Sequence, residues 1–235
     1  NPIKPERAKT RTGEDVYWAR QEINLEPIAP PDGFVVSEAT WIQALRSEIA
    51  AWNEATACAL APHLRLLPVS SGGAARDDGR NVVTLITKRW CPADARGDLA
   101  ACYDPRVQSI THVRTRTDRQ GPSSGEIHEV DIEVNAVDFR WSLDGDEPGT
   151  RSLRAVLGHE LGHVLGLAHA CGDAHARETI GSCSPGAIAS IMYPDPTEPG
   201  RRRVLAPDRE SAMAVCTPPS QSATSGSCTS SNGAR

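Results

Sequence analysis

Apolar residues recur at every third or fourth position between residues 41 and 55, and this spacing places them on one face of a long helix. The stripe consists of Trp41, Leu45, Ile49, Trp52 and Ala55. Ser37 stands just before the stripe, and serine is a residue type that caps helix N-termini. The pattern therefore predicts a helix of about five turns that buries one face. Helical character returns from about Ser152 to Leu165 and again from Pro207 to Val215, where Pro207 suits a first turn.

Several shorter segments are rich in β-branched and aromatic residues and are predicted to be strands. They are Val16 to Leu25, Asn81 to Ile86, Ser109 to Thr117 and Glu126 to Asn135. In the last segment Val130, Ile132 and Val134 alternate with Asp131 and Glu133. Because successive side chains of a strand point to opposite faces, we expect one face in the core and the other in water.

The ends of the chain carry no such patterns. Residues 1–13 are polar and contain two prolines, so they are interpreted as an N-terminal arm. Residues 217–235 are rich in Ser, Thr and Gly and cannot bury a core, so a flexible tail is predicted there. Residues 14–216 then form one folded domain, and no internal repeat interrupts them.

Composition narrows the class of protein. The 235 residues carry a formal net charge of −5, and 39% of them are hydrophobic, which suits a monomer with one globular domain. The longest apolar runs are a few residues, far short of the roughly 20 that a membrane-spanning helix needs. The mildly acidic balance and the absence of a long basic run argue against nucleic acid as a partner.

Seven cysteines are present, and none of them forms a Cys-x-x-Cys pair. Cys91 with Cys102, and Cys171 with Cys183, each bracket a short polar loop of the kind that disulfides close. Cys58, Cys216 and Cys228 are left for one further bridge and one free thiol, in a pairing that spacing does not decide. Disulfides imply an oxidising compartment, so a secreted or extracytoplasmic location is predicted.

The segment from Gly158 to His169 reads G-H-E-L-G-H-V-L-G-L-A-H. His159 and His163 stand four residues apart, so on a helix both imidazoles project from one face and can bind one zinc ion. Glu160 is then directed toward the position of a zinc-bound water. Gly166 can adopt the positive φ that ends a helix, and the turn brings in His169. Three histidines leave the fourth tetrahedral position open, which is typical of a catalytic zinc.

These five positions match the long zinc signature of the metzincin clan of metallopeptidases, and the chain resembles that clan. Met192, in the segment Ser190 to Pro194, follows His169 at the distance of the clan's Met-turn. The sequence Ile-Met-Tyr-Pro, followed by Leu205-Ala206-Pro207-Asp208, is most similar to matrixins, the matrix-metalloproteinase family, in their compact bacterial-type form. The matched segments span about residues 150–216.

The resemblance implies an α+β, metzincin-like zinc-peptidase fold. Its parts are a twisted, mostly parallel sheet, two long helices, a zinc helix at about residues 152–165, a Met-turn at 190–194, and a small C-terminal subdomain with a final helix. A pocket for the residue after the scissile bond is expected between the zinc helix and the segment Pro194 to Leu205.

The implied activity is that of a secreted zinc-dependent metalloendopeptidase that acts on proteins or peptides. Zn²⁺ would activate a water, with Glu160 as general base, and His159, His163 and His169 as zinc ligands. Gly166 and Met192 would support the site. Tyr193 either donates a hydrogen bond to the transition state or only packs in the wall.

Two features depart from matrixins. No cysteine precedes the first strand, so the family's cysteine switch is not predicted. Matrixins commonly hold a structural zinc and calcium ions upstream of the zinc helix. In this chain only His128, Asp131 and the Asp144-Gly145-Asp146 turn offer ligand types there, so calcium or a second zinc has little support.

Two alternatives share the fold. One is a catalytically silent or latent zinc-binding interaction module, against which the presence of Glu160 argues. The other is an enzyme of the same chemistry that cleaves an amide in a cell-wall peptide.

Overall fold

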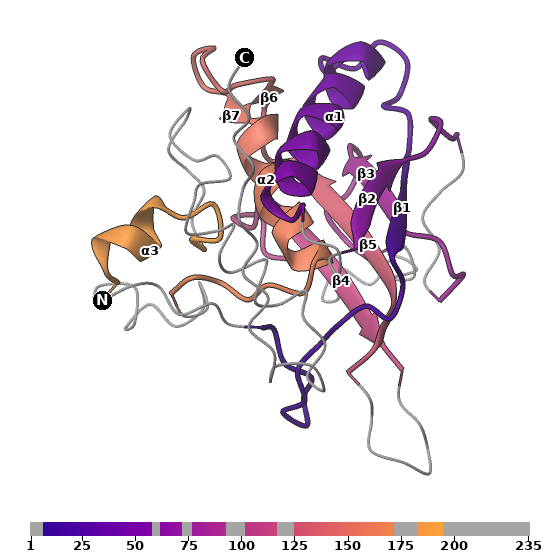
Figure 1. Cartoon of the computed structure of the whole chain (residues 1–235). Helices are drawn as coiled ribbons and strands as arrows, with labels where there is room; N and C mark the ends of the chain where they lie inside the picture. Colours follow the sequence, from indigo (N-terminus) through magenta and orange to yellow (C-terminus); the bar gives the residue numbers. More distant parts are fainter. Residues whose placement is uncertain are drawn as a thin grey trace, which may run out of the picture.

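The computed structural model describes residues 7–57, 62–71, 77–92, 102–116, 125–171 and 183–194. Five strands form one twisted sheet in the order β2-β1-β3-β5-β4, and two helices, α1 and α2, lie side by side on one face of it (Figure 1). The strands are β1 (Glu22–Pro27), β2 (His63–Leu66), β3 (Val82–Ile86), β4 (Ser109–Thr115) and β5 (Ile127–Asn135). All neighbours in the sheet are parallel except the edge strand β4, which runs antiparallel to β5. The predicted mixed architecture with a mostly parallel sheet is therefore confirmed.

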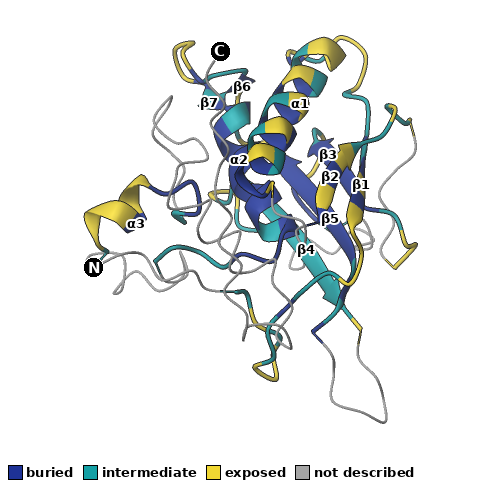
Figure 2. Cartoon of the chain, in the orientation of Figure 1, coloured by how far each residue is buried: buried dark blue, intermediate teal, exposed yellow. Residues whose placement is uncertain are grey.

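Helix α1 (Glu38–Ala55) begins where the sequence predicts, with the Ser37 side chain accepting a hydrogen bond from the Thr40 amide. All five residues of the predicted apolar stripe are buried, while the opposite face of α1 is exposed (Figure 2). Helix α2 (Leu153–Val164) is capped by Ser152 and is buried along most of its length. Two of the three predicted helices are thus confirmed to within a few residues.

Two contacts fix α1 against α2. Trp52 of α1 donates its indole N–H to the carbonyl oxygen of Gly158 over 2.8 Å. Glu48 of α1 is buried and forms an ion pair with Arg154 of α2, with 2.8 Å between Oε1 and Nε. Because both links reach the N-terminal half of α2, α1 holds the helix that carries the histidines from behind.

The first predicted strand differs from the observed one. Sequence predicts a strand from Val16 to Leu25, whereas β1 begins at Glu22 and continues through Pro27. The chain changes partner within this run: Tyr17 pairs with the start of β5, and β1 pairs with β2 and β3. Sequence analysis missed β2, whose four residues carry exposed His63 and Arg65, and the short helix α3 (Pro185–Ala189). It also missed the two-residue strands β6 (Trp141–Ser142) and β7 (Arg151–Ser152), which pair with each other.

The predicted water-facing side of β5 is wrong. Asp131 and Glu133 are buried, as is Glu129 on the same face, and β5 is dark along its length in Figure 2. Their carboxylates are satisfied by groups far away in the sequence. Glu129 accepts hydrogen bonds from the amides of Asp77 and Gly79, at 2.7 and 2.6 Å. Asp131 accepts one from the amide of Val82. This face of β5 is therefore a buried polar layer.

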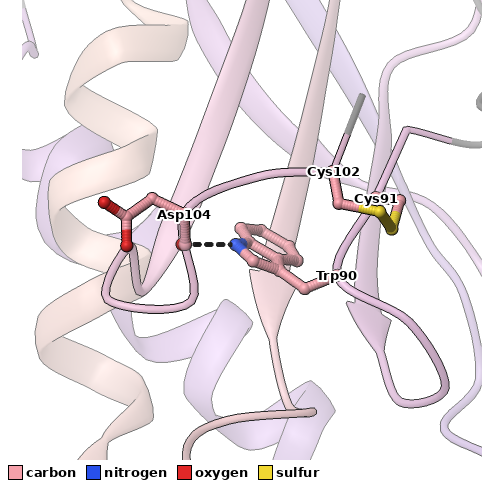
Figure 3. The surroundings of a disulfide bond; sticks show 4 residues. All are labelled: Trp90, Cys91, Cys102 and Asp104. Carbon is pink, nitrogen blue, oxygen red and sulfur yellow. Dashed lines mark hydrogen bonds between the residues drawn. A yellow bond between two sulfur atoms is a disulfide. The ribbon is translucent and has the colours of Figure 1, made fainter. Parts of the chain in front are cut away.

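The Cys91–Cys102 disulfide anchors the chain between β3 and β4. Next to it, Trp90 donates its indole N–H to the carbonyl oxygen of Asp104 over 3.1 Å (Figure 3). The Trp90 ring also packs on Tyr103, with 4.8 Å between centroids, and the Tyr103 hydroxyl lies 3.2 Å from His112 Nε2 of β4. The second predicted bridge, Cys171–Cys183, is also formed.

Some predictions fall outside the described residues. They are the final helix at 207–215, the tail at 217–235, Cys58, Cys216 and Cys228, and all but the first residue of the segment Pro194 to Leu205. Within the part of the chain that the structure describes, no helix is both long and apolar enough to cross a membrane.

Candidate metal centre

Three histidine side chains meet beside α2. His159 and His163 lie one turn apart on the helix, and their Nε2 atoms are 3.1 Å from each other. Gly166 has φ of 88°, so the chain reverses just after the helix and brings in His169. The Nε2 atom of His169 is 3.2 Å from those of both His159 and His163. The structure thus brings together the three histidines that the sequence predicts as zinc ligands.

The outer ring nitrogens of two histidines are held by backbone carbonyls. Nδ1 of His159 lies 2.8 Å from the carbonyl oxygen of Ile191, and Nδ1 of His163 lies 2.8 Å from that of Leu167. A carbonyl only accepts, so each Nδ1 carries the proton and donates. In the neutral rings each Nε2 then presents a lone pair toward the centre of the cluster, as metal-binding histidines do.

This donor set fits zinc. Lone pairs that face each other across about 3 Å repel unless a cation lies between them. Zinc binds imidazole nitrogen at about 2.0–2.1 Å in a tetrahedral arrangement, which places the nitrogens about 3.3 Å apart. The observed separations of 3.1–3.2 Å are close to this value. Within the described residues, this is the one cluster of three or more potential metal ligands.

Glu160 is buried on α2, with 3% of its surface exposed. Both carboxylate oxygens accept hydrogen bonds from hydroxyl groups of β4. Ser109 Oγ donates to Oε1 and Thr111 Oγ1 donates to Oε2, each over 2.5 Å. Sequence analysis missed these two residues, although their spacing of two on a strand places them on one face. Their position opposite Glu160 depends on how the strand packs against α2.

Met192 packs against α2. A Cβ atom added at Gly162, between His159 and His163, would overlap the Met192 side chain, and only 3% of Met192 is exposed. The Met192 carbonyl oxygen accepts a hydrogen bond from the amide of Ala170, next to His169, over 2.8 Å. The segment around Met192 therefore contacts the third histidine's loop as well as the helix. Tyr193 follows and is partly buried.

Residues near the N-terminus support the C-terminal end of α2. The Ala8 amide donates to the carbonyl oxygen of Gly166 over 2.9 Å, and the Trp18 indole donates to that of Val164 over 2.7 Å. Helix C-terminal carbonyls lack partners within the helix, so such donors satisfy them. Residues 7–9, which the sequence assigns to an arm, thus lie beside the loop that carries His169.

The upstream candidates for extra metals have other partners. Asp131 accepts from the Val82 amide, and Asp144 forms an ion pair with Arg154 at 3.2 Å. His128 Nε2 lies 3.9 Å from the carboxylate of Asp77. They do not form a second three-ligand cluster within the described ranges.

Comparison with known proteins gives matches among solved structures only. No protein-family model matches the sequence, and no curated protein is similar enough to count as a relative. Among solved structures, the chain is similar to metalloproteinase-II from Bacteroides fragilis, with 15% identity and a TM-score of 0.37. The match covers 92% of this chain but only 58% of that one. At this level the histidine geometry, and not the match, supports the functional inference.

Proposed function

We propose that the chain is a zinc-dependent metalloendopeptidase. The observation that supports this most directly is the convergence of the Nε2 atoms of His159, His163 and His169, at 3.1–3.2 Å from one another. Glu160, which follows His159 on the same helix, is buried. Three neutral imidazoles with one open position favour catalytic rather than structural zinc. The resemblance of these residues to the metzincin signature, and of the Met192 segment to matrixins, points to the same activity.

The proposed roles combine the geometry of the three histidines with the resemblance of the sequence to the metzincin signature. The three histidines hold zinc, which when bound would acidify a water molecule and polarise the scissile carbonyl. Glu160 takes a proton from the attacking water and passes it to the leaving amine nitrogen as the C–N bond breaks. Gly166 and Met192 support the ligands. Tyr193, one residue beyond Met192, is the proposed hydrogen-bond donor to the transition state.

The edge strand β4 favours an extended peptide as substrate. In the described part of the sheet β4 pairs only with β5, so its outer edge offers unpaired backbone groups beside Glu160. Such an edge can add a peptide as a further strand, which suits cleavage within a chain. The two disulfides suit an oxidising, extracytoplasmic compartment. A monomer suffices for this activity, since all proposed groups come from one chain.

The test compares the parent with Glu160→Ala, both loaded with zinc, on a diverse peptide library. We expect both proteins to bind about one zinc, and the kcat of the variant to fall by about 10²–10⁴. Glu38→Ala, which removes an exposed carboxylate at the start of α1, serves as the control and should cut as the parent does.

A zinc-loaded parent that cuts no peptide would overturn the peptidase proposal and favour the binding module on the same fold. Cell-wall peptide fragments in the same panel test the alternative of an enzyme that cleaves an amide in a cell-wall peptide. Such an enzyme would cleave these fragments and leave the linear peptides intact.

A further inference from the structure

The carboxylate of Glu160 is held by the sheet and not by its own helix. Each of its two oxygens accepts one hydrogen bond, from Ser109 Oγ and from Thr111 Oγ1, at 2.5 Å in both cases. We propose that Ser109 and Thr111 are positioning residues that fix the plane of this carboxylate, whose residue directly follows His159 on α2. The proposal rests on the proposed function, since it assigns a role in that same reaction.

The two hydroxyls occupy unusual places on the sheet. In the register of β4 with β5, Ser109 lies opposite Val134 and Thr111 lies opposite Ile132. Directly opposed residues share a face, and both of these partners are fully buried in the core. Ser109 and Thr111 are thus polar residues on an otherwise apolar face, at the point where α2 packs against β4.

Burial explains why the hydroxyls are needed. Glu160 is 3% exposed, so water does not solvate its carboxylate freely. A buried charge without hydrogen-bond donors is strongly unfavourable, whereas bonds from hydroxyls to a carboxylate are among the stronger ones. A valine at position 111 would fill the space as well as threonine but would leave Oε2 without its donor. The hydroxyl therefore has a role that packing alone does not explain.

The two hydrogen bonds also leave the Glu160 carboxylate able to accept a proton. Each carboxylate oxygen can accept two hydrogen bonds, so each keeps one site after binding a hydroxyl. β4 is held by its antiparallel ladder with β5, so both donors belong to the sheet and the carboxylate belongs to α2. A base held in this way needs little reorganisation to receive a proton, and small misplacements of catalytic groups are costly in rate.

The kinetic test uses zinc-loaded Ser109→Ala, Thr111→Val and the double variant. We expect the double variant to lose about 10–100-fold in kcat, with KM within about twofold and zinc content unchanged. Ser109→Thr and Thr111→Ser keep the hydroxyls and should restore most of kcat. Thr115→Val removes a hydroxyl four residues beyond Thr111 on the same strand and should leave kcat as in the parent. Unchanged kcat in the double variant would overturn the positioning role.

A second readout does not depend on activity. In the zinc-free protein, a double-mutant cycle between Thr111→Val and Glu160→Ala measures whether the two groups interact. We expect the unfolding equilibrium constant of the double variant to differ by about tenfold from the value that the two single variants predict together. Additive effects of the two substitutions would contradict the proposal. If the zinc-loaded parent cleaves no peptide, the proposed function fails. The cycle then still decides whether the strand holds the carboxylate.

Discussion

At the residue scale, Gly162 is placed where no side chain fits. A Cβ atom there would overlap Met192 Sδ and would lie 3.0 Å from Met192 Cε and 3.1 Å from Trp52 Cζ2. Met192 and Trp52 are both buried, so neither can move aside freely. The absence of a side chain lets the helix that carries His159 and His163 lie directly on Met192.

Gly162→Ala is therefore expected to lower the free energy of unfolding by about 1–3 kcal/mol, because overpacking exceeds the gain in helix propensity. The substitution should also weaken zinc binding, because it would displace the segment of Ile191 and Met192. The carbonyl of Ile191 accepts a hydrogen bond from His159, and that of Met192 accepts one from Ala170, next to His169. Denaturant unfolding and zinc titration measure the two effects.

Gly158→Ala, in the same helix and next to His159, is the matched control. Its added Cβ would lie 3.1 Å from Glu48 Oε2 and would not overlap any atom as the Cβ at position 162 overlaps Met192 Sδ, so its loss of stability should be the smaller of the two. Equal losses for the two variants would show that Met192 is not the cause.

The three-histidine cluster could be predicted from sequence because local geometry determines it. Helical spacing places His159, Glu160 and His163, and a glycine with positive φ accounts for the turn to His169. Ser109 and Thr111 could not be found in this way. They lie 51 and 49 residues before Glu160, and their contact with it depends on the packing of β4 against α2.

At the element scale, the far face of β5 shows how alternation can mislead. Asp131 and Glu133 alternate with apolar residues and therefore suggest a solvated face. Their partners come from elsewhere: the Val82 amide for Asp131 and His112 of β4 for Glu133. Glu129 is in addition 2.9 Å from Arg114 Nε. A single sequence does not reveal that a loop and a neighbouring strand will cover these carboxylates.

Burial in this layer raises the pKa of Asp131 to about 6, and the nearby Glu129 charge acts in the same direction. A carboxyl whose pKa is higher in the folded than in the unfolded state stabilises the fold when protonated. Its contribution is present below about pH 4 and is lost as the pH rises to about 6.

Asp131→Asn keeps an oxygen for the Val82 amide and removes the buried charge. At pH 7 the variant should be more stable than the parent by about 1–2 kcal/mol, and the difference should shrink toward pH 4. Urea unfolding of both proteins between pH 4 and 7 measures it. Asp32→Asn, at an exposed position, is the control. A difference that stays constant across this range would contradict the assignment.

At the scale of the whole molecule, separate segments converge on α2. Helix α1 holds its N-terminal half through Trp52 and Glu48, and residues 8 and 18 hold its C-terminal end. The segment 183–194 lies against it through Ile191 and Met192. The sequence order of helix, strands and second helix predicts the sheet and the helices. The supports from residues 8 and 18 and from the segment 183–194 arise only in the folded structure.

The two disulfides are expected to act differently on this assembly. Cys91–Cys102 and Cys171–Cys183 join residues 11 and 12 positions apart, so each should contribute a similar stabilisation of about 2–3 kcal/mol by restricting the unfolded chain. Of these two bridges, only Cys171–Cys183 is close in the sequence to His169 and to the segment of Met192. Cys171 follows His169 by two residues, and Cys183 begins the segment that contains Met192.

Replacing both cysteines of one bridge by serine separates stability from metal binding. Both double variants should unfold at lower denaturant concentration by similar amounts. Zinc affinity should fall by about 10-fold only in the variant without Cys171–Cys183, because that bridge helps to hold the loop of His169. Loss of a group that orients a metal ligand commonly weakens metal binding by this amount or more. Zinc titration against a chelator of known affinity measures this. Equal zinc affinities in the two variants would mean that the Ala170–Met192 hydrogen bond and the turn at Gly166 suffice to place His169.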